Sequence, residues 1–164
     1  MKRMVILLMG VSGSGKTTVG MLLAQQLGWQ FADADDYHSA ANKDKMRHGI
    51  PLTDADRAPW LANLRSLIAG WIADGTNAVL ACSALKQSYR DELQVGDAVR
   101  VVYLNVSPEI LSQRLLERKG HYMKQDMLDS QLATLEEPQH AFVIDGSKSP
   151  PEIANDILQQ LGLT

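Results

Sequence analysis

Residues 10–17 read Gly-Val-Ser-Gly-Ser-Gly-Lys-Thr and follow directly on an apolar run at residues 4–9. A buried strand that ends in a glycine-rich turn and continues as a helix points free backbone N–H groups at an anion. Lys16 can then reach the terminal phosphates of a nucleotide, and the Thr17 hydroxyl can ligate Mg²⁺. The alternative is a glycine-rich turn without a ligand, but the strand-to-helix context favours a phosphate-binding loop. The nucleotide-binding residues are therefore predicted to be Gly10, Val11, Ser12, Gly13, Ser14, Gly15, Lys16, Thr17 and Thr18.

Acidic residues follow the short strand expected at residues 30–33. Asp33 and Asp35 stand two apart just past the strand end, so both carboxylates can face the phosphate loop. We assign Asp33 to Mg²⁺, and Asp35, with Lys16, to catalysis, because a carboxylate can accept a hydrogen bond from a substrate hydroxyl and orient it for attack. The alternative is a solvated acidic loop. His38 is either a polar residue of the substrate pocket or the start of the next helix.

Two arginines lie after the fourth expected strand. Arg114 and Arg118 are four residues apart, so they share one face of a helix. Small phosphoryl-transfer kinases close a lid that brings arginines to the migrating phosphoryl group. We therefore predict that Arg114 contacts the nucleotide, that Arg118 is catalytic, and that residues 114–128 form the lid. The alternative is an ordinary solvated basic helix face.

Three further arginines, Arg47, Arg57 and Arg90, are candidates for holding a small anionic substrate. A guanidinium group binds a carboxylate in two-point geometry, which suits recognition of an organic acid. For Arg57 the alternative is an ion pair with Asp54 or Asp56.

Strand-like and helix-like segments alternate along the chain, which predicts a parallel sheet covered by helices on both faces. The expected class is a three-layer α/β/α phosphate-loop domain spanning residues 1–164, with a five-stranded sheet, a helical lid and a substrate-binding helical region at about residues 36–62. Ligands of such sheets bind beyond the carboxyl ends of the strands. The strands are expected at 4–9, 30–33, 77–82, 99–106 and 141–144, and the helices at 17–27, 39–48, 55–73, 86–94, from 108, at 125–135 and at 151–161.

The composition narrows the function classes. With 164 residues, 45% hydrophobic content and a formal charge of −3, the chain has material for one core and lacks the basic excess of a nucleic-acid binder. No apolar run approaches the length that spans a bilayer, so no membrane partner is expected. The single cysteine, Cys82, excludes an internal disulfide and fits a reducing cytoplasm. Its apolar surroundings predict a buried small hydrophobe rather than a nucleophile.

These stretches together resemble the small bacterial gluconokinase family. The resemblance rests on residues 10–17, 33–38, 42–52, 54–61, 81–86, 89–91, 114–118 with His121, and 130–138. It implies ATP-dependent phosphorylation of D-gluconate at the 6-hydroxyl, giving 6-phospho-D-gluconate and ADP. It also implies a fold like that of nucleoside monophosphate and shikimate kinases, and often a homodimer.

Matched residue by residue, the resemblance implies that Lys16 and Thr17 hold phosphates and Mg²⁺, and that Asp35 faces the acceptor hydroxyl. It further implies that Arg57 and Arg90 lie near the sugar acid and that Arg118 belongs to the lid, and His121 is expected to contact substrate. In related folds, adenine contacts come from the loop after the last strand, here residues 146–149.

Two other functions remain compatible with the sequence. Another small-molecule kinase, acting on shikimate or a nucleoside monophosphate, would share the fold. Shikimate kinases place a glycine-rich turn after the third strand, where this chain has residues 82–85, Cys-Ser-Ala-Leu. A non-catalytic nucleotide-binding regulatory module is the rival from another class. The intact set of Lys16, Thr17, Asp33, Asp35 and Arg118 counts against it.

Overall fold

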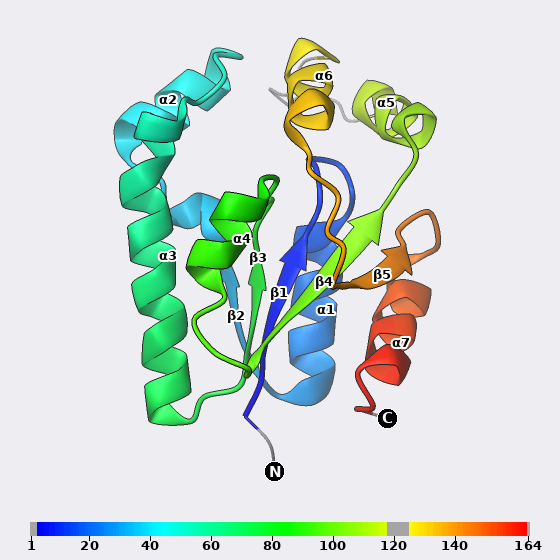
Figure 1. Cartoon of the computed structure of the whole chain (residues 1–164). Coiled ribbons are helices and arrows are strands. Elements are labelled where there is room, and N and C mark those ends of the chain that lie inside the picture. The colour runs from blue at the N-terminus through cyan, green and yellow to red at the C-terminus, as the bar shows by residue number, and fades with distance from the viewer. Residues whose placement is uncertain (1–2, 118–124, 164) are drawn as a thin grey trace.

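A parallel sheet forms the centre of the fold (Figure 1). The computed structural model describes residues 3–117 and 125–163, and within them five strands pair in the order β2-β3-β1-β4-β5. Every pairing is parallel, as the alternating sequence pattern predicts. The strands are β1 (Val5–Met9), β2 (Gln30–Asp33), β3 (Ala78–Ala81), β4 (Val99–Asn105) and β5 (Phe142–Asp145).

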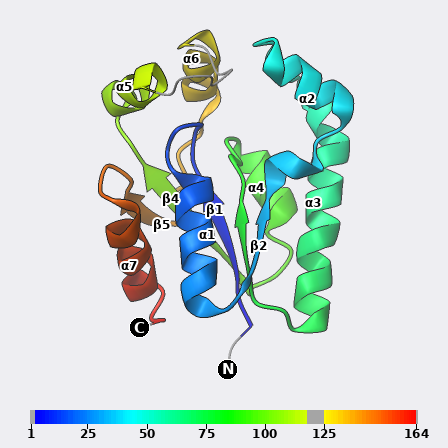
Figure 2. The ribbon, with the colours of Figure 1, turned by 180° about the vertical axis from the view of Figure 1, so that it is seen from behind.

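Helices cover both faces of this sheet, which confirms the three-layer class. In the two opposite views, α1 and α7 lie over one face, and α3 and α4 lie over the other (Figures 1 and 2). The helices are α1 (Lys16–Leu27), α2 (Ala40–Arg47), α3 (Asp54–Asp74), α4 (Gln87–Leu93), α5 (Pro108–Glu117), α6 (Gln125–Thr134) and α7 (Pro150–Gln160), with a short 3-10 helix, η1 (Ala34–Tyr37).

Strand β1 is apolar on both sides because it is buried on both sides. Val5, Leu7 and Met9 pack in one cluster with apolar residues of α3 and α4. Ile6 and Leu8 pack in a second cluster with residues of α1 and α7. Successive side chains of a strand point to opposite faces, so one continuous apolar run supplies two cores. The burial of β1 fixes the position of the loop that follows it.

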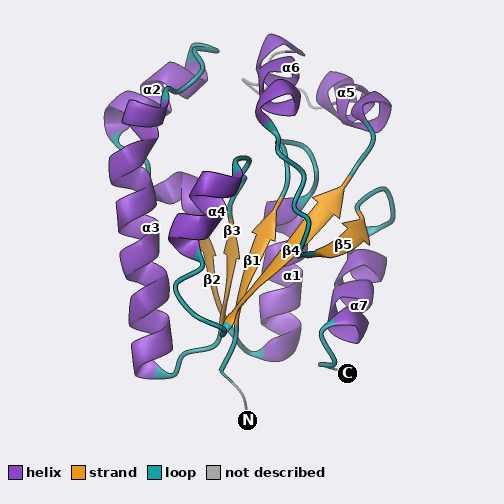
Figure 3. Ribbon diagram, in the orientation of Figure 1, coloured by secondary structure: helices purple, strands orange, loops and turns teal. Residues whose placement is uncertain are grey.

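Local capping explains where α3 and α7 begin. Thr53 and Ser149 each accept a hydrogen bond from a backbone N–H three residues on, and an acid at that position bonds back to the cap, completing a capping box. Helices α2, α5 and α6 stand above the carboxyl ends of the strands (Figure 3). None of the helices that the structure describes is long and apolar enough to cross a bilayer. The site is therefore expected at the edge where these three helices stand.

Candidate active site

The phosphate loop joins β1 to α1 and opens toward the carboxyl edge of the sheet. Gly13 and Gly15 have φ angles of 87° and 96°, a left-handed conformation that residues with a Cβ rarely adopt. Gly15 is the N-cap of α1 and has no side chain to occupy the first N–H groups of the helix. Lys16 folds back over the loop, and its Nζ donates to the carbonyl oxygen of Val11 at 3.2 Å. This geometry presents N–H groups and one ammonium group to an anion.

A cavity of about 430 Å³ adjoins this loop. It is bounded by the phosphate loop, the end of β2, α3, the segment after β3, and α6. Of the predicted loop residues, Gly10, Val11 and Ser14 do not line it. The lining residues are Ser12, Gly13, Gly15, Lys16, Thr17, Thr18, Asp33, Asp35, His38, Met46, Pro51, Leu52, Arg57, Trp60, Ala81, Ser83, Leu85, Tyr89, Met127, Ser130, Gln131 and Thr134.

Thr17 and Asp33 meet at the floor of the cavity. The Thr17 hydroxyl donates to Asp33 Oδ2 at 2.8 Å, and Asp33 Oδ1 accepts from the backbone N–H of Asp35 at 3.0 Å. Among the described residues no cluster of three or more His, Cys, Asp or Glu side chains is found that could hold a metal ion. One hydroxyl and one carboxylate nevertheless suit Mg²⁺, which keeps several waters and takes further oxygens from substrate phosphates. The residues present therefore fit the predicted ion.

Asp35 is the acid that faces the transfer space. Its side chain is accessible from the cavity, yet protein surrounds it closely, and this loss of bulk water raises the pKa of the carboxyl. Lys16 opposes the shift, while the Asp33 carboxylate adds to it. A carboxylate with a raised pKa is a better proton acceptor. The arrangement suits a group that receives the proton of an attacking hydroxyl.

His38 forms one wall of the cavity together with Trp60. The two rings stack with centroids 4.3 Å apart and planes 11° apart. Burial, with the positive charges of Arg57 and Lys43, lowers the pKa of His38 to about 4. His38 is thus a neutral pocket residue, as one of the two sequence readings predicts. The Trp60 indole donates to the carbonyl oxygen of Ala34 at 2.7 Å, which ties α3 to η1.

The amide of Asn42 determines which nitrogen of His38 carries the proton. Asn42 Nδ2 lies 2.8 Å from the carbonyl oxygen of Asp56 and 3.2 Å from His38 Nδ1. A carbonyl oxygen can only accept, so the Asn42 nitrogen must be the atom placed there. His38 Nδ1 therefore accepts, and the neutral ring carries its hydrogen on Nε2. The ring offers a hydrogen-bond donor to a ligand.

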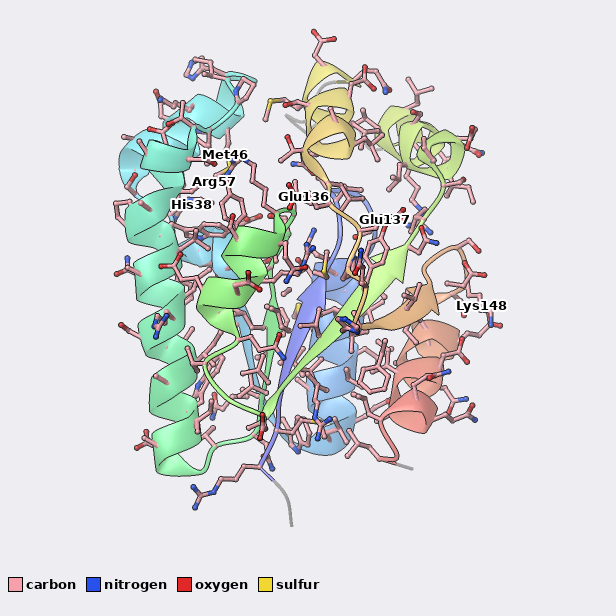
Figure 4. The ribbon with its side chains drawn as sticks, in the orientation of Figure 1. His38, Met46, Arg57, Glu136, Glu137 and Lys148 are labelled. Atoms are coloured by element: carbon pink, nitrogen blue, oxygen red, sulfur yellow. The ribbon has the colours of Figure 1, made fainter. Side chains whose placement is uncertain are left out.

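Among the arginines that the structure describes, Arg57 is the one that lines the cavity, near His38 and Met46 (Figure 4). Its Nη1 donates to the Tyr89 hydroxyl at 3.0 Å, and the Tyr89 hydroxyl donates in turn to Asp54 Oδ1. Lys86 pairs with Asp54 at 2.9 Å. The hydrogen bonds from Tyr89 and Lys86 lower the pKa of Asp54.

The acids proposed as alternative partners of Arg57 are therefore engaged elsewhere. Asp56 pairs with Lys45 at 2.9 Å, and Asp54 pairs with Lys86. Tyr89 holds the Arg57 guanidinium in place without neutralising it. This leaves a positioned cation on the wall of the cavity.

Arg47 and Arg90, expected beside Arg57, lie elsewhere. Arg47 is exposed at the end of α2, with its Nη2 3.4 Å from Asp44. Arg90 is only 2% exposed, and it donates to the carbonyl oxygens of Ala84 at 2.7 Å and of Glu136 at 2.6 Å. Neither lines the cavity. The structure thus gives Arg90 a bracing role, because its acceptors are the Gln87 side chain and three backbone carbonyls that the sequence does not reveal.

The brace holds a backbone turn at the cavity wall. Ala84 has a φ angle of 45° and is fully buried, so a residue with a Cβ occupies the left-handed region where glycine is usual. Glu136 closes the same turn, donating its N–H to the carbonyl oxygen of Leu85 and accepting from the N–H of Gln87, both at 2.8 Å. Leu85 lines the cavity. Arg90 therefore acts on the site through the backbone. Cys82, beside this turn, is buried as predicted, and burial raises its pKa to about 12.

Arg114, predicted to contact the nucleotide, does not line the cavity but joins the phosphate loop to the loop that follows β5. Its guanidinium donates to the carbonyl oxygens of Gly13 and Gly146, both at 2.8 Å. Gly146 begins the loop proposed for adenine contacts. Lys148 lies in this loop (Figure 4) and pairs with Asp156 of α7 at 3.0 Å. Arg118 and His121 lie outside the described residues, as do positions 118–124 of the predicted lid.

Helix α6 supplies cavity residues that sequence reasoning gave no role. Gln131 Oε1 accepts from the backbone N–H of Ser12 at 2.7 Å, across 119 residues of sequence. Met127, Ser130 and Thr134 line the cavity from the same helix. The signal available was the stretch 130–138, which carries part of the family resemblance. It marked the segment without indicating which side chain reaches the phosphate loop.

Comparison with known proteins identifies the family. The Shikimate kinase family model matches residues 12–162. A protein from Xenopus tropicalis named "Probable gluconokinase" is 47% identical over 94% of this chain and 91% of its own length. The gluconokinase of Gluconobacter oxydans is 44% identical over 94% and 89%. The crystal structure of a gluconokinase from Sinorhizobium meliloti superposes with a TM-score of 0.88 at 39% identity, covering 98% of this chain and 94% of that one. The chain therefore belongs to the gluconokinase family, within the wider group of P-loop kinases that the Shikimate kinase model describes.

Proposed function

We propose that the chain transfers the γ-phosphoryl group of ATP to the 6-hydroxyl of D-gluconate, giving 6-phospho-D-gluconate and ADP. One observation carries this proposal: a single cavity holds Lys16 of the phosphate loop, the Asp35 carboxyl and the Arg57 guanidinium. These groups suit, in turn, a phosphate, an attacking hydroxyl and a carboxylate. Family membership supplies the substrate class, because the relatives of known name are gluconokinases.

In this mechanism each residue performs a step for which its geometry fits. Lys16 and the N–H groups at the start of α1 hold the β- and γ-phosphates. Thr17 and Asp33 would hold Mg²⁺, which would neutralise charge on the phosphates. Asp35 accepts the proton of the 6-hydroxyl as its oxygen attacks the γ-phosphorus and the bond to ADP breaks. Arg57, oriented by Tyr89, binds the carboxylate at the other end of the sugar acid.

Three further features of the enzyme are proposed from the sequence: additional site residues, the base contacts, and its assembly and location. Arg118 and His121 complete the site from the lid, residues 146–149 contact the base, and the enzyme is a cytoplasmic homodimer. Light scattering on purified protein measures the oligomeric state directly. Nucleotide competition with ATP, GTP and CTP measures the base preference.

The test is coupled ADP release with a panel of acceptors: D-gluconate, other sugar acids, shikimate and nucleoside monophosphates. We expect turnover with D-gluconate, and product carrying phosphate on the terminal carbon by ³¹P NMR. ATP use that does not depend on gluconate, or turnover with none of the acceptors, would contradict the proposal. Turnover with shikimate or a nucleoside monophosphate alone would assign the chain to the rival acceptor.

A further inference from the structure

The hydrogen bond between α6 and the phosphate loop has a chemical consequence. The Ser12 N–H belongs to the loop whose N–H groups present themselves to phosphate, and Gln131 Oε1 already accepts it at 2.7 Å. A backbone N–H can only donate, so the carboxamide oxygen must face it and the amide orientation is settled. The two N–H bonds of Gln131 Nε2 are then left for other partners. Within the described part of the chain, this bond to Ser12 is the one side-chain hydrogen bond recorded for Gln131.

Helix α6 is held firmly enough to place that amide. Leu128 is 2% exposed and packs with Val11 of the phosphate loop and Leu111 of α5. Just past the helix, Glu136 is bonded to the turn after β3 and to buried Arg90. Gln131 lies between these two anchors, so its position does not depend on its own hydrogen bond alone.

The Gln131 amide lines the cavity in which the phosphoryl transfer is proposed to occur. Gln131 and Ser12 line the same cavity as Lys16 and Asp35. During transfer, charge spreads over the equatorial oxygens of the phosphoryl group, and donors fixed in advance stabilise that charge. A neutral amide supplies donors there without adding a charge that would alter the pKa of Asp35.

We propose that Gln131 is a catalytic residue: its Oε1 holds the Ser12 N–H, and its Nε2 donates a hydrogen bond to the phosphoryl group in transit. This deepens the proposed function and rests on it, since it assigns a role within the same transfer. No proton or bond is exchanged by Gln131. It fixes the phosphate loop relative to α6 and stabilises charge at the transferred group.

Two substitutions separate the oxygen from the nitrogen. Gln131→Met removes both functions at similar size. Gln131→Glu keeps an acceptor for Ser12 and removes the donors, but it also adds a negative charge to the cavity. The uncharged Gln131→Met is therefore the variant that carries the expected loss, and Gln131→Glu tests whether the oxygen alone suffices. We expect both to lower kcat about 100-fold, as when one fixed donor of a charge-stabilising site is removed. We expect the KM for gluconate and the melting temperature to stay close to wild type. Gln160→Met and Gln160→Glu, at an exposed position of α7, are the matched controls.

The outcomes decide between roles. A Gln131→Glu enzyme with wild-type kcat shows that the oxygen alone matters, and overturns the proposal. Tighter ATP binding by Gln131→Met, measured by calorimetry, makes Gln131 a competitor for the phosphate site and also overturns it. The wild type is assayed first with the acceptor panel: turnover with a different acceptor overturns the gluconate assignment while the variants are still compared with that acceptor. No turnover with any acceptor overturns both.

Discussion

The nucleotide side and the acceptor side of the cavity are built in different ways. The phosphate-binding part of the nucleotide side comes from one contiguous stretch, residues 10–18, whose backbone supplies most of the binding groups. Asp33 joins this stretch from the end of β2. The acceptor side is assembled from η1, α2, α3, α4 and α6, and its groups are side chains held by other side chains. A contiguous site is specified locally, whereas an assembled site depends on how distant elements pack. The two sides therefore respond differently to substitution.

The arginines show the same difference at single residues. Arg57 and Arg90 carry the same group, and the family resemblance predicts that both lie near the sugar acid. Arg57 lines the cavity and is oriented by a tyrosine hydroxyl, while Arg90 is buried against backbone carbonyls. Residue type alone does not separate the two roles. The hydrogen-bond acceptor of each guanidinium distinguishes the two roles.

The largest expected effect is at Asp35, where the two sides meet. Asp35→Asn keeps the size of the side chain but removes the proton acceptor, so kcat should fall about 10²- to 10⁴-fold. ATP affinity should remain nearly unchanged, because Asp33 and Thr17 form the predicted magnesium site. Steady-state kinetics and calorimetry with ATP and Mg²⁺ measure the two quantities. If ATP affinity fell together with kcat, Asp35 would instead be a ligand of Mg²⁺ and would belong to the nucleotide side.

The second effect tests whether Arg90 is a brace. Arg90→Met leaves buried carbonyl oxygens of Ala84 and Glu136 without a donor, so the free energy of unfolding should drop by about 3 kcal/mol. Urea unfolding measures it, with exposed Arg47→Met as the control. A stable Arg90→Met enzyme with a raised KM for gluconate would return Arg90 to the substrate site.

The sequence predicts the sheet and helices well because their causes are local. The signals lie in short stretches of sequence. A continuous apolar run marks β1, and cap residues such as Thr53 and Ser149 mark the starts of helices. The sequence pattern predicts no helix at residues 34–37, where the structure has η1. It depends on Asp33 accepting from the backbone of Asp35, a single hydrogen bond with no hydrophobic pattern.

The site is predictable on the side where it is contiguous. Lys16 and Thr17 belong to the motif at the start of α1, and Asp33, predicted from the acidic residues after β2, meets Thr17 there. Arg90 and Gln131 escape sequence reasoning since most of their partners are backbone atoms, which no residue type identifies. The carbonyl oxygen of Glu136 and the N–H of Ser12 are also distant in sequence. Nothing in a sequence marks the carbonyl of Ala84 or the N–H of Ser12 as the partner of a particular side chain.

A third, smaller effect concerns the cation of the acceptor side. Arg57→Met removes the charge-assisted bond to the substrate carboxylate, which is worth about 1.5–3 kcal/mol, so the KM for gluconate should rise about 10- to 100-fold. The KM for ATP should hold steady. Tyr89→Phe, which removes the hydroxyl that orients Arg57, should give a smaller rise in the same constant. If only the KM for ATP rose, Arg57 would contact the nucleotide, and the division of the cavity into two sides would be wrong.

The smallest effect is expected in the pH dependence that His38 confers. The folded-state pKa of about 4 lies below the ordinary 6.5, so the unfolded chain binds the proton more readily between these values. The neutral ring therefore favours folding above about pH 6.5, and this advantage shrinks as pH falls toward the folded-state value. Histidine NMR should show the His38 ring titrating near 4, and the KM for gluconate should show no step from this residue between about pH 6 and 8. In urea unfolding, the wild-type advantage over His38→Gln should narrow on acidification. A ring that titrates near 6.5 would mean that the acceptor wall is open to water, with no fixed donor on Nε2.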